Sequence, residues 1–112
     1  MSARNQLILA PPYPVEQGLK RLGANLRTAR LRRNLTILEV AQKIGTGPRA
    51  VMDAEKGKAS TAIAVYAALL WVYDLLAQFS AAGNPDSDEE GKTLAKSRER
   101  TRARTEELDN EF

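Results

Sequence analysis

The 112-residue chain contains no cysteine and no histidine. The missing cysteines exclude disulfides and thiol nucleophiles, and the missing histidines exclude the commonest general base and the usual zinc ligand sets. Catalysis would have to rest on carboxylates, lysines or hydroxyls alone, and paired acids such as Glu89–Glu90 lie in a polar tail that offers no pocket. The sequence therefore predicts a protein that is not an enzyme, with no cofactor and no metal site.

Long apolar runs are also missing. The longest, residues 62–76, contains Tyr66 and is too short and too rich in alanine to favour a membrane span. Residues 7–10 are shorter than the core of a signal peptide and run straight into prolines. Because the absence of cysteine also fits a reducing interior, we expect a soluble cytoplasmic protein with no membrane partner.

The positive charge of the chain is concentrated in one region. Residues 16–58 hold ten lysines and arginines against four acids, whereas residues 86–112 hold six against nine. Positive charge clustered beside a helix that fits a DNA groove is typical of duplex-binding proteins, because each neutralised phosphate releases counterions. The alternative is a basic helix face that only contacts solvent.

The stretch from Leu35 to Gly57 is typical of a helix-turn-helix. Thr36 is placed to cap the first helix and Gly45 to end it, because glycine readily adopts the left-handed conformation of a tight helix exit. Gly47–Pro48 then restarts a helix with proline at its first position. The apolar residues of the first helix fall at the i, i+3, i+4, i+7 spacing of one buried face, and they are Ile37, Val40, Ala41 and Ile44.

The second of these helices has an inner and an outer side. Val51 and Ala54 are spaced to face the first helix. The other positions point outward, where a major groove of DNA could receive them, and they are Arg49, Ala50, Asp53 and Lys56.

The composition divides the chain into an extended N-terminal arm (residues 1–15), a helical domain (16–83) and a charged tail (84–112). Prolines at 11, 12 and 14 favour an extended backbone until about Val15, and the triplet Leu7–Leu9 is either a short strand across a dimer or a disordered end. Thr61 and Asp74 are candidate caps of the last two core helices.

The tail is predicted to be disordered, or transiently helical, when it is alone. Its large apolar residues are Leu94, Leu108 and Phe112, which cannot bury enough surface to offset the entropy of the chain. Its basic centre, residues 96–104, could contact DNA phosphates and its acidic ends a basic partner. The alternative is a tail that only aids solubility.

Together these elements, from about Leu19 to Phe79, make the chain resemble the Xre/Cro-type helix-turn-helix repressors. The matching positions are Arg30, Leu35–Thr36, Glu39–Ala41, Gly45, Val51 and Glu55–Gly57. The resemblance implies an all-α, five-helix, lambda-repressor-like DNA-binding domain.

The same resemblance implies roles for individual residues. Arg30 and Glu55 correspond to a partly buried structural ion pair, which agrees with the place of Arg30 on an apolar helix face. Among the DNA-facing positions, those at base edges are Pro48, Arg49 and Asp53. Those at phosphates are Thr36, Lys43, Lys56 and Lys58, and the set also includes Thr46 and Ala50. Arg49 is the one strong direct reader, most simply bidentate to a guanine, whereas Asp53 either accepts from a cytosine amino group or repels the backbone.

A narrower resemblance, to HipB-like antitoxins, covers Ser60–Leu70, Asp74–Leu76, the break at Asn84–Asp86 and the arginine-rich tail. It implies a homodimer that represses its own operon by binding operator DNA and that holds a HipA-like kinase toxin inactive. The alternatives are a kinase-binding regulatory subunit with weak DNA binding and a free-standing Xre-type regulator. The apolar content of residues 63–79 independently predicts a two-fold dimer through the last core helices.

Overall fold

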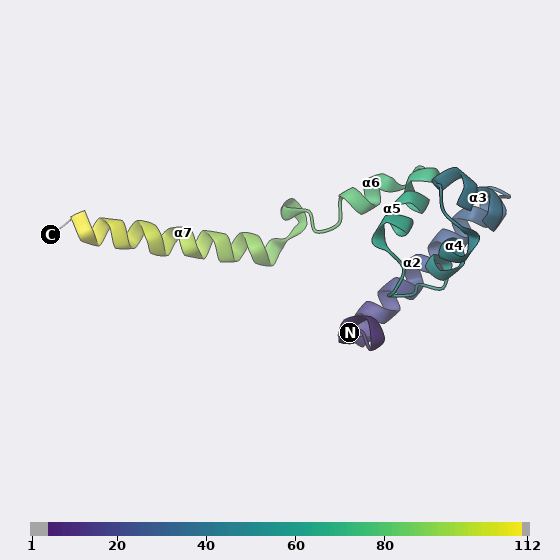
Figure 1. Ribbon diagram of the computed structural model, residues 1–112. Coiled ribbons are helices and arrows are strands. Elements are labelled where there is room, and N and C mark those ends of the chain that lie inside the picture. The colour runs from purple at the N-terminus through teal and green to yellow at the C-terminus, as the bar shows by residue number, and fades with distance from the viewer. Residues whose placement is uncertain (1–4, 111–112) are drawn as a thin grey trace. The chain divides into compact units, whose positions relative to one another are not determined.

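The computed structural model describes residues 5–110, and every regular element in this range is helical (Figure 1). Within this range the chain forms two compact units, which divide after Ser80. The elements are α1 (Gln6–Leu9), α2 (Tyr13–Arg32), α3 (Ile37–Ile44), α4 (Pro48–Glu55), α5 (Ile63–Val72), α6 (Leu76–Ser80), the 3-10 turn η1 (Pro85–Ser87) and α7 (Glu89–Asn110). The all-helical class is the one expected from the sequence. No helix in the described part of the chain is long and apolar enough to cross a membrane.

Residues 6–9 and 13–15 are helical, so the predicted extended arm is wrong for these residues, whereas residues 10–12 between the two helices are not helical. The triplet Leu7–Leu9 is neither a strand nor disordered but belongs to α1, where the Asn5 side chain accepts a hydrogen bond from the Leu7 N–H at 2.9 Å. α2 begins at Tyr13 because Pro12 serves as its N-cap and Pro14 lies in the first turn, where no N–H is needed.

α3 and α4 begin and end as the sequence predicts. The Thr36 hydroxyl accepts from the Glu39 N–H at 3.1 Å, and the Glu39 carboxylate accepts from the Thr36 N–H at 3.2 Å, which completes a capping box. Gly45 ends α3 in the left-handed conformation, at φ 80°, and Gly47–Pro48 starts α4. The turn is therefore specified by local chemistry.

The core of the first unit lies where α2, α3, α4 and α5 meet. Val40, Ala41, Val51 and Ala54 are completely buried, as the helical spacing predicts. The remaining buried core residues are Leu26, Ala29, Tyr66, Leu69, Leu70 and Tyr73. The helices α3 to α6 lie within the predicted domain of residues 16–83. α2 begins before this range, at Tyr13, and the compact unit ends slightly before residue 83, at Ser80.

Two glycines let α2 approach the end of α4 closely. A Cβ atom on Gly23 would lie 2.6 Å from the Ala54 carbonyl oxygen, and one on Gly57 would overlap the Leu19 carbonyl. Gly57 also has a positive φ of 69°. Any larger residue at either position would push α4 away from α2, so these glycines fix the distance between the two helices.

A buried ion pair joins the same helices. Arg30 Nε donates to Glu55 Oε2 at 2.7 Å and its second terminal nitrogen donates to Oε1 at 3.0 Å, while the first donates to the Leu35 carbonyl at 3.0 Å. Both side chains are less than a tenth exposed. The hydrogen bonds to Glu55 raise the pKa of Arg30 above its ordinary value. The pairing predicted from the sequence is therefore present.

The ends of α5 differ from the prediction. Ala62, not Thr61, is the N-cap of α5, and it makes no side-chain capping bond. Asp74 has a φ of 60° and lies at the end of α5 instead of capping α6. Its N–H donates to the Trp71 carbonyl, and the Leu75 N–H donates to the Leu70 carbonyl. This left-handed exit satisfies the last carbonyls of α5.

Residues 89–110 form the helix α7, so the expected disorder of the tail is wrong for this range. Asp88 accepts from the Gly91 N–H at 3.0 Å, and Glu89 and Glu90 favour the positive end of the helix dipole. No residue of α7 is buried. Local interactions alone therefore support this helix, and Phe112, a candidate anchor, lies outside the described residues.

Glu55→Ala should lower the free energy of unfolding by about 3 to 5 kcal/mol, because it leaves the Arg30 charge buried without its partner. The matched control is Glu16→Ala, which removes an exposed pair with Lys20 at 3.0 Å and should cost less than about 1 kcal/mol. Denaturant unfolding at pH 7 measures both. Equal losses in the two variants would contradict a structural role for the buried pair.

The burial of Tyr73 leads us to expect that the protein loses stability in alkaline solution. The side chain of this residue is 1% exposed, its hydroxyl has no partner within residues 5–110, and burial raises its pKa to about 12. The unfolded chain loses this proton at about pH 10, so the stabilisation is complete below pH 10 and is lost as the pH rises to about 12.

Tyr73→Phe should therefore flatten the fall in the free energy of unfolding between about pH 10 and 12, where the proton is lost only on unfolding. At pH 7 the variant should be at least as stable as wild type, because the lost hydroxyl has no partner. Tyr13→Phe, at a side chain that is 71% exposed, is the control. Parallel pH curves for wild type and Tyr73→Phe would refute this assignment.

Candidate nucleic-acid interface

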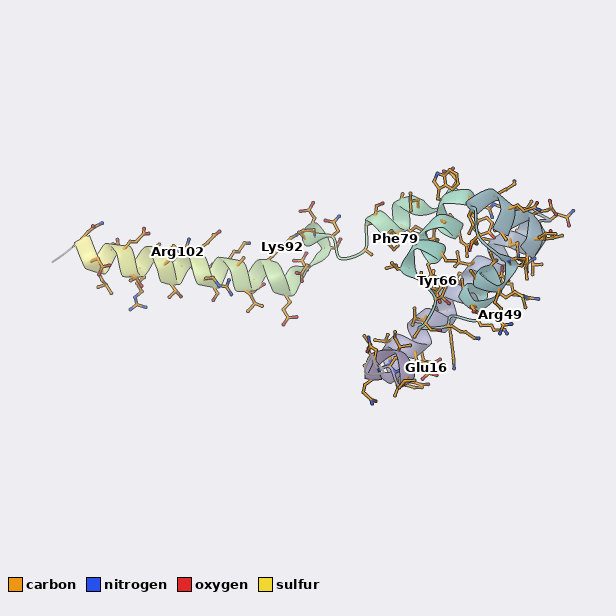
Figure 2. The ribbon with its side chains drawn as sticks, viewed as in Figure 1. Glu16, Arg49, Tyr66, Phe79, Lys92 and Arg102 are labelled. Carbon is orange, nitrogen blue, oxygen red and sulfur yellow. The ribbon has the colours of Figure 1, made fainter. Side chains whose placement is uncertain are left out.

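A charged cluster lies on the outer side of α4. Arg49, at the second position of the helix, has a side chain that is 79% exposed and stands at the edge of the first unit in Figure 2. Asp53 Oδ1 lies 3.5 Å from Arg49 Nε and 3.2 Å from Lys58 Nζ. We call Arg49, Asp53 and Lys58 the α4 cluster.

Asp53 organises this cluster. Its side chain is only 24% exposed, whereas those of its two cationic neighbours reach the solvent. Neither contact has hydrogen-bond alignment at Oδ1, so the attraction is mainly electrostatic. A single half-buried carboxylate thus holds two longer cationic side chains close together on one surface.

The backbone of Lys58 is held in place by three hydrogen bonds. Its N–H donates to the Asp53 carbonyl at 3.1 Å, and its own carbonyl accepts from the Tyr66 hydroxyl at 2.8 Å and from the Thr61 N–H at 3.2 Å. Tyr66 is a core residue of α5, and burial raises its pKa. Sequence reasoning missed this role, because Tyr66 falls at a helical core spacing and nothing local shows where its hydroxyl reaches.

The other predicted site residues lie outside this cluster. Lys43, Pro48 and Lys56 are exposed, whereas Thr46 and Ala50 are half-buried. Thr36 uses its hydroxyl oxygen to cap α3, which leaves the hydroxyl proton available as a donor. Within residues 5–110, no hydrogen bond or ion pair joins Thr36, Lys43 or Lys56 to the α4 cluster.

The N-terminal helix borders the loop that carries Lys56 and Lys58. A shallow cavity of about 400 Å³ separates them and is lined mainly by Ile8–Pro11, Leu19 and residues 56–59. The segment predicted to be a separate arm therefore lies beside part of the candidate interface. The sequence contains no signal for this proximity, because it brings together segments about fifty residues apart.

Comparison of the chain with protein-family models, curated proteins and solved structures gives no match. Any function of this surface must therefore be inferred from the side chains that it presents. It offers long, exposed cationic donors and a hydroxyl, which are the groups that contact phosphates and the edges of bases.

Tyr66→Phe should loosen the loop after α4, because the Lys58 carbonyl loses one of its two donors and keeps only the Thr61 N–H. We expect a loss of about 0.5 to 1.5 kcal/mol and faster amide exchange at residues 58–61, with the amides of α3 unaffected. Tyr73→Phe is a closely matched control, since it removes a buried tyrosine hydroxyl that has no partner within the described residues. Unchanged exchange in the loop would show that Tyr66 does not hold it.

Proposed function

We propose that this protein is a sequence-specific DNA-binding repressor of transcription whose helix α4 enters the major groove. The observation that carries the proposal is the α4 cluster, in which an exposed arginine and a lysine share one carboxylate at the surface of a helix packed against α2, α3 and α5. The N-terminal residues of such a helix contact base edges in helix-turn-helix proteins. The protein would act in the cytoplasm.

The helical arrangement supports a lambda-repressor-like fold for α2 to α6, with α3 and α4 as the helix-turn-helix. Support comes from the tight turn at Gly45 and from the buried pair of Arg30 and Glu55, both of which the resemblance to Xre/Cro-type repressors implies. In this assignment α4 is the recognition helix and α3 crosses the phosphate backbone.

The residues of the interface would divide into two groups. Arg49 would read a guanine through two parallel hydrogen bonds, which fix one base pair. Phosphate contacts would come from the surrounding donors, which position the protein without reading sequence, and these are Thr36, Lys43, Lys56 and Lys58. Because Asp53 lies beside two cations of its own chain, we favour a role in positioning them over a direct contact with cytosine.

A two-fold dimer would complete this function. Ile63 and Trp71 on α5 are 69% and 60% exposed, and Phe79 on α6 is 38% exposed. Large apolar side chains that face solvent favour a protein interface. A second copy would cover them and place two recognition helices about 34 Å apart, in successive major grooves of a palindromic operator.

Arg49→Ala should cost about 1 to 3 kcal/mol of affinity for the DNA upstream of the gene and relax the preference at one base pair, because it removes the proposed base contact. Arg27→Ala is the matched control, since it removes an exposed arginine of α2 whose side chain makes no hydrogen bond or ion pair within residues 5–110. Mobility shifts on operator and random duplexes compare the two. Equal losses on both duplexes would reduce Arg49 to a phosphate contact.

The resemblance of residues 60–104 to HipB-like antitoxins supports a second proposal, that the repressor also binds a HipA-like kinase toxin. The exposed apolar residues of α5 and α6 would serve either this partner or the dimer. Copurification with the product of the adjacent gene, followed by a mobility shift with and without it, separates an antitoxin from a free-standing regulator. Copurification without a shift would favour a kinase-binding subunit.

A further inference from the structure

The cations of α7 are gathered in its centre. Residues 92–104 contain six lysines and arginines and one acid, Glu99, whereas both ends of the helix are acidic. At 1.5 Å per residue this block is about 18 Å long. The helix thus carries a local surplus of five positive charges although its net charge over residues 89–110 is zero.

The helical form of this segment sorts its residues into rows spaced four apart. One row is entirely cationic and consists of Lys92, Lys96, Arg100 and Arg104, and a neighbouring row carries only hydroxyls, from Thr93, Ser97, Thr101 and Thr105. We call these eight residues the basic face. The only acid within the block, Glu99, lies in a different row, and Arg98 and Arg102 lie in a row that continues into Glu106.

The charges of this face are almost uncompensated. Lys92 Nζ lies 3.4 Å from Glu89 Oε1, but none of Lys96, Arg100 and Arg104 makes a hydrogen bond or ion pair within residues 5–110. Thr93, Thr101 and Thr105 donate to carbonyls one turn earlier, so these hydroxyls bring no negative charge. Figure 2 shows side chains projecting on both sides of α7, with Lys92 and Arg102 labelled.

The side chains of α7 favour an anionic partner over an apolar one. Its large apolar side chains are Leu94 and Leu108, 58% and 51% exposed and two heptads apart, which is too little for a coiled coil or for insertion into a lipid surface. A second copy of α7 aligned in register would place cations against cations. The hydroxyls of Thr93, Thr101 and Thr105 already donate their protons to carbonyls, so the lysines and arginines are the groups that this face offers to phosphates.

We propose that α7 is a second DNA-contacting element, which binds the phosphate backbone of a duplex through its basic face without reading sequence. The block of about 18 Å is long enough to cross a major groove about 12 Å wide and meet phosphates on both edges. The acidic ends then repel the backbone on either side, so the contact is confined to the centre of the helix. The proposal rests on the proposed DNA-binding function but does not involve the α4 cluster.

The test compares two double variants of the full chain. Arg100→Gln/Arg104→Gln removes two charges from the basic face, and Arg98→Gln/Arg102→Gln removes two from the opposite side with the same spacing and nearly the same helix propensity. The readouts are affinity for operator and random duplexes over a range of salt, and helix content by circular dichroism.

The basic-face variant should bind both duplexes at least about tenfold more weakly at 0.1 M salt. The slope of log affinity against log salt should fall in magnitude by about 1.8, the value for two lost phosphate contacts. The control variant should change by less than half as much. Arg49→Ala, in contrast, should affect the operator more than random DNA.

The other possible results of these binding measurements would contradict either this proposal or the proposed sequence-specific function. Equal losses in the two double variants would show an effect of net charge and overturn the proposal, as would unchanged duplex binding by the basic-face variant. If that variant keeps duplex affinity but no longer binds polyglutamate, the face serves an acidic protein and the proposal is wrong. If α7 is needed while Arg49→Ala changes nothing, the inference holds and the proposed sequence-specific function fails.

Discussion

The buried contact between Arg30 and Glu55 controls the position of α4, and with it the surface on which any recognition depends. One guanidinium joins α2, the carbonyl of Leu35 ahead of α3 and the last residue of α4. Desolvating two charges is costly, and the fork geometry of arginine offsets that cost because each carboxylate oxygen receives its own donor. The close approach of Gly23 and Gly57 then leaves α4 little freedom to slide along α2.

Local signals in the sequence were enough to predict α3, α4 and the turn between them. The capping box at Thr36, the left-handed exit at Gly45 and the proline start at Pro48 each act within a few residues, so their outcome depends little on the rest of the fold. The prediction of an extended backbone failed at residues 6–9 and 13–15, and at 13–15 it failed because it read the prolines only as helix breakers. Proline is tolerated at the start of a helix, where its missing N–H costs nothing.

The features that sequence reasoning missed depend on contacts between distant segments. The hydroxyl of Tyr66 meets the carbonyl of Lys58 only after α5 has packed on α4, and the pairing of Asp53 with Lys58 depends on the path of the loop between them. The resemblance assigned Lys58 to the phosphates, and no local signal in the sequence showed what holds this residue in place. In the fold, hydrogen bonds with three groups hold the backbone of Lys58, and its ammonium nitrogen lies 3.2 Å from Asp53 Oδ1.

The helices α4 and α7 are stabilised by opposite means. α4 has eight residues, too few to be stable alone in water, so its packing against α2, α3 and α5 maintains it and makes its outer surface rigid. α7 has 22 residues and buries none, so helix propensity and its capped N-terminus support it against the repulsion of its central cations. An anion that neutralised those cations would stabilise the helical form over the unfolded one by mass action. The folding of α7 and its binding to a polyanion would therefore reinforce each other, whereas α4 would meet its ligand already formed.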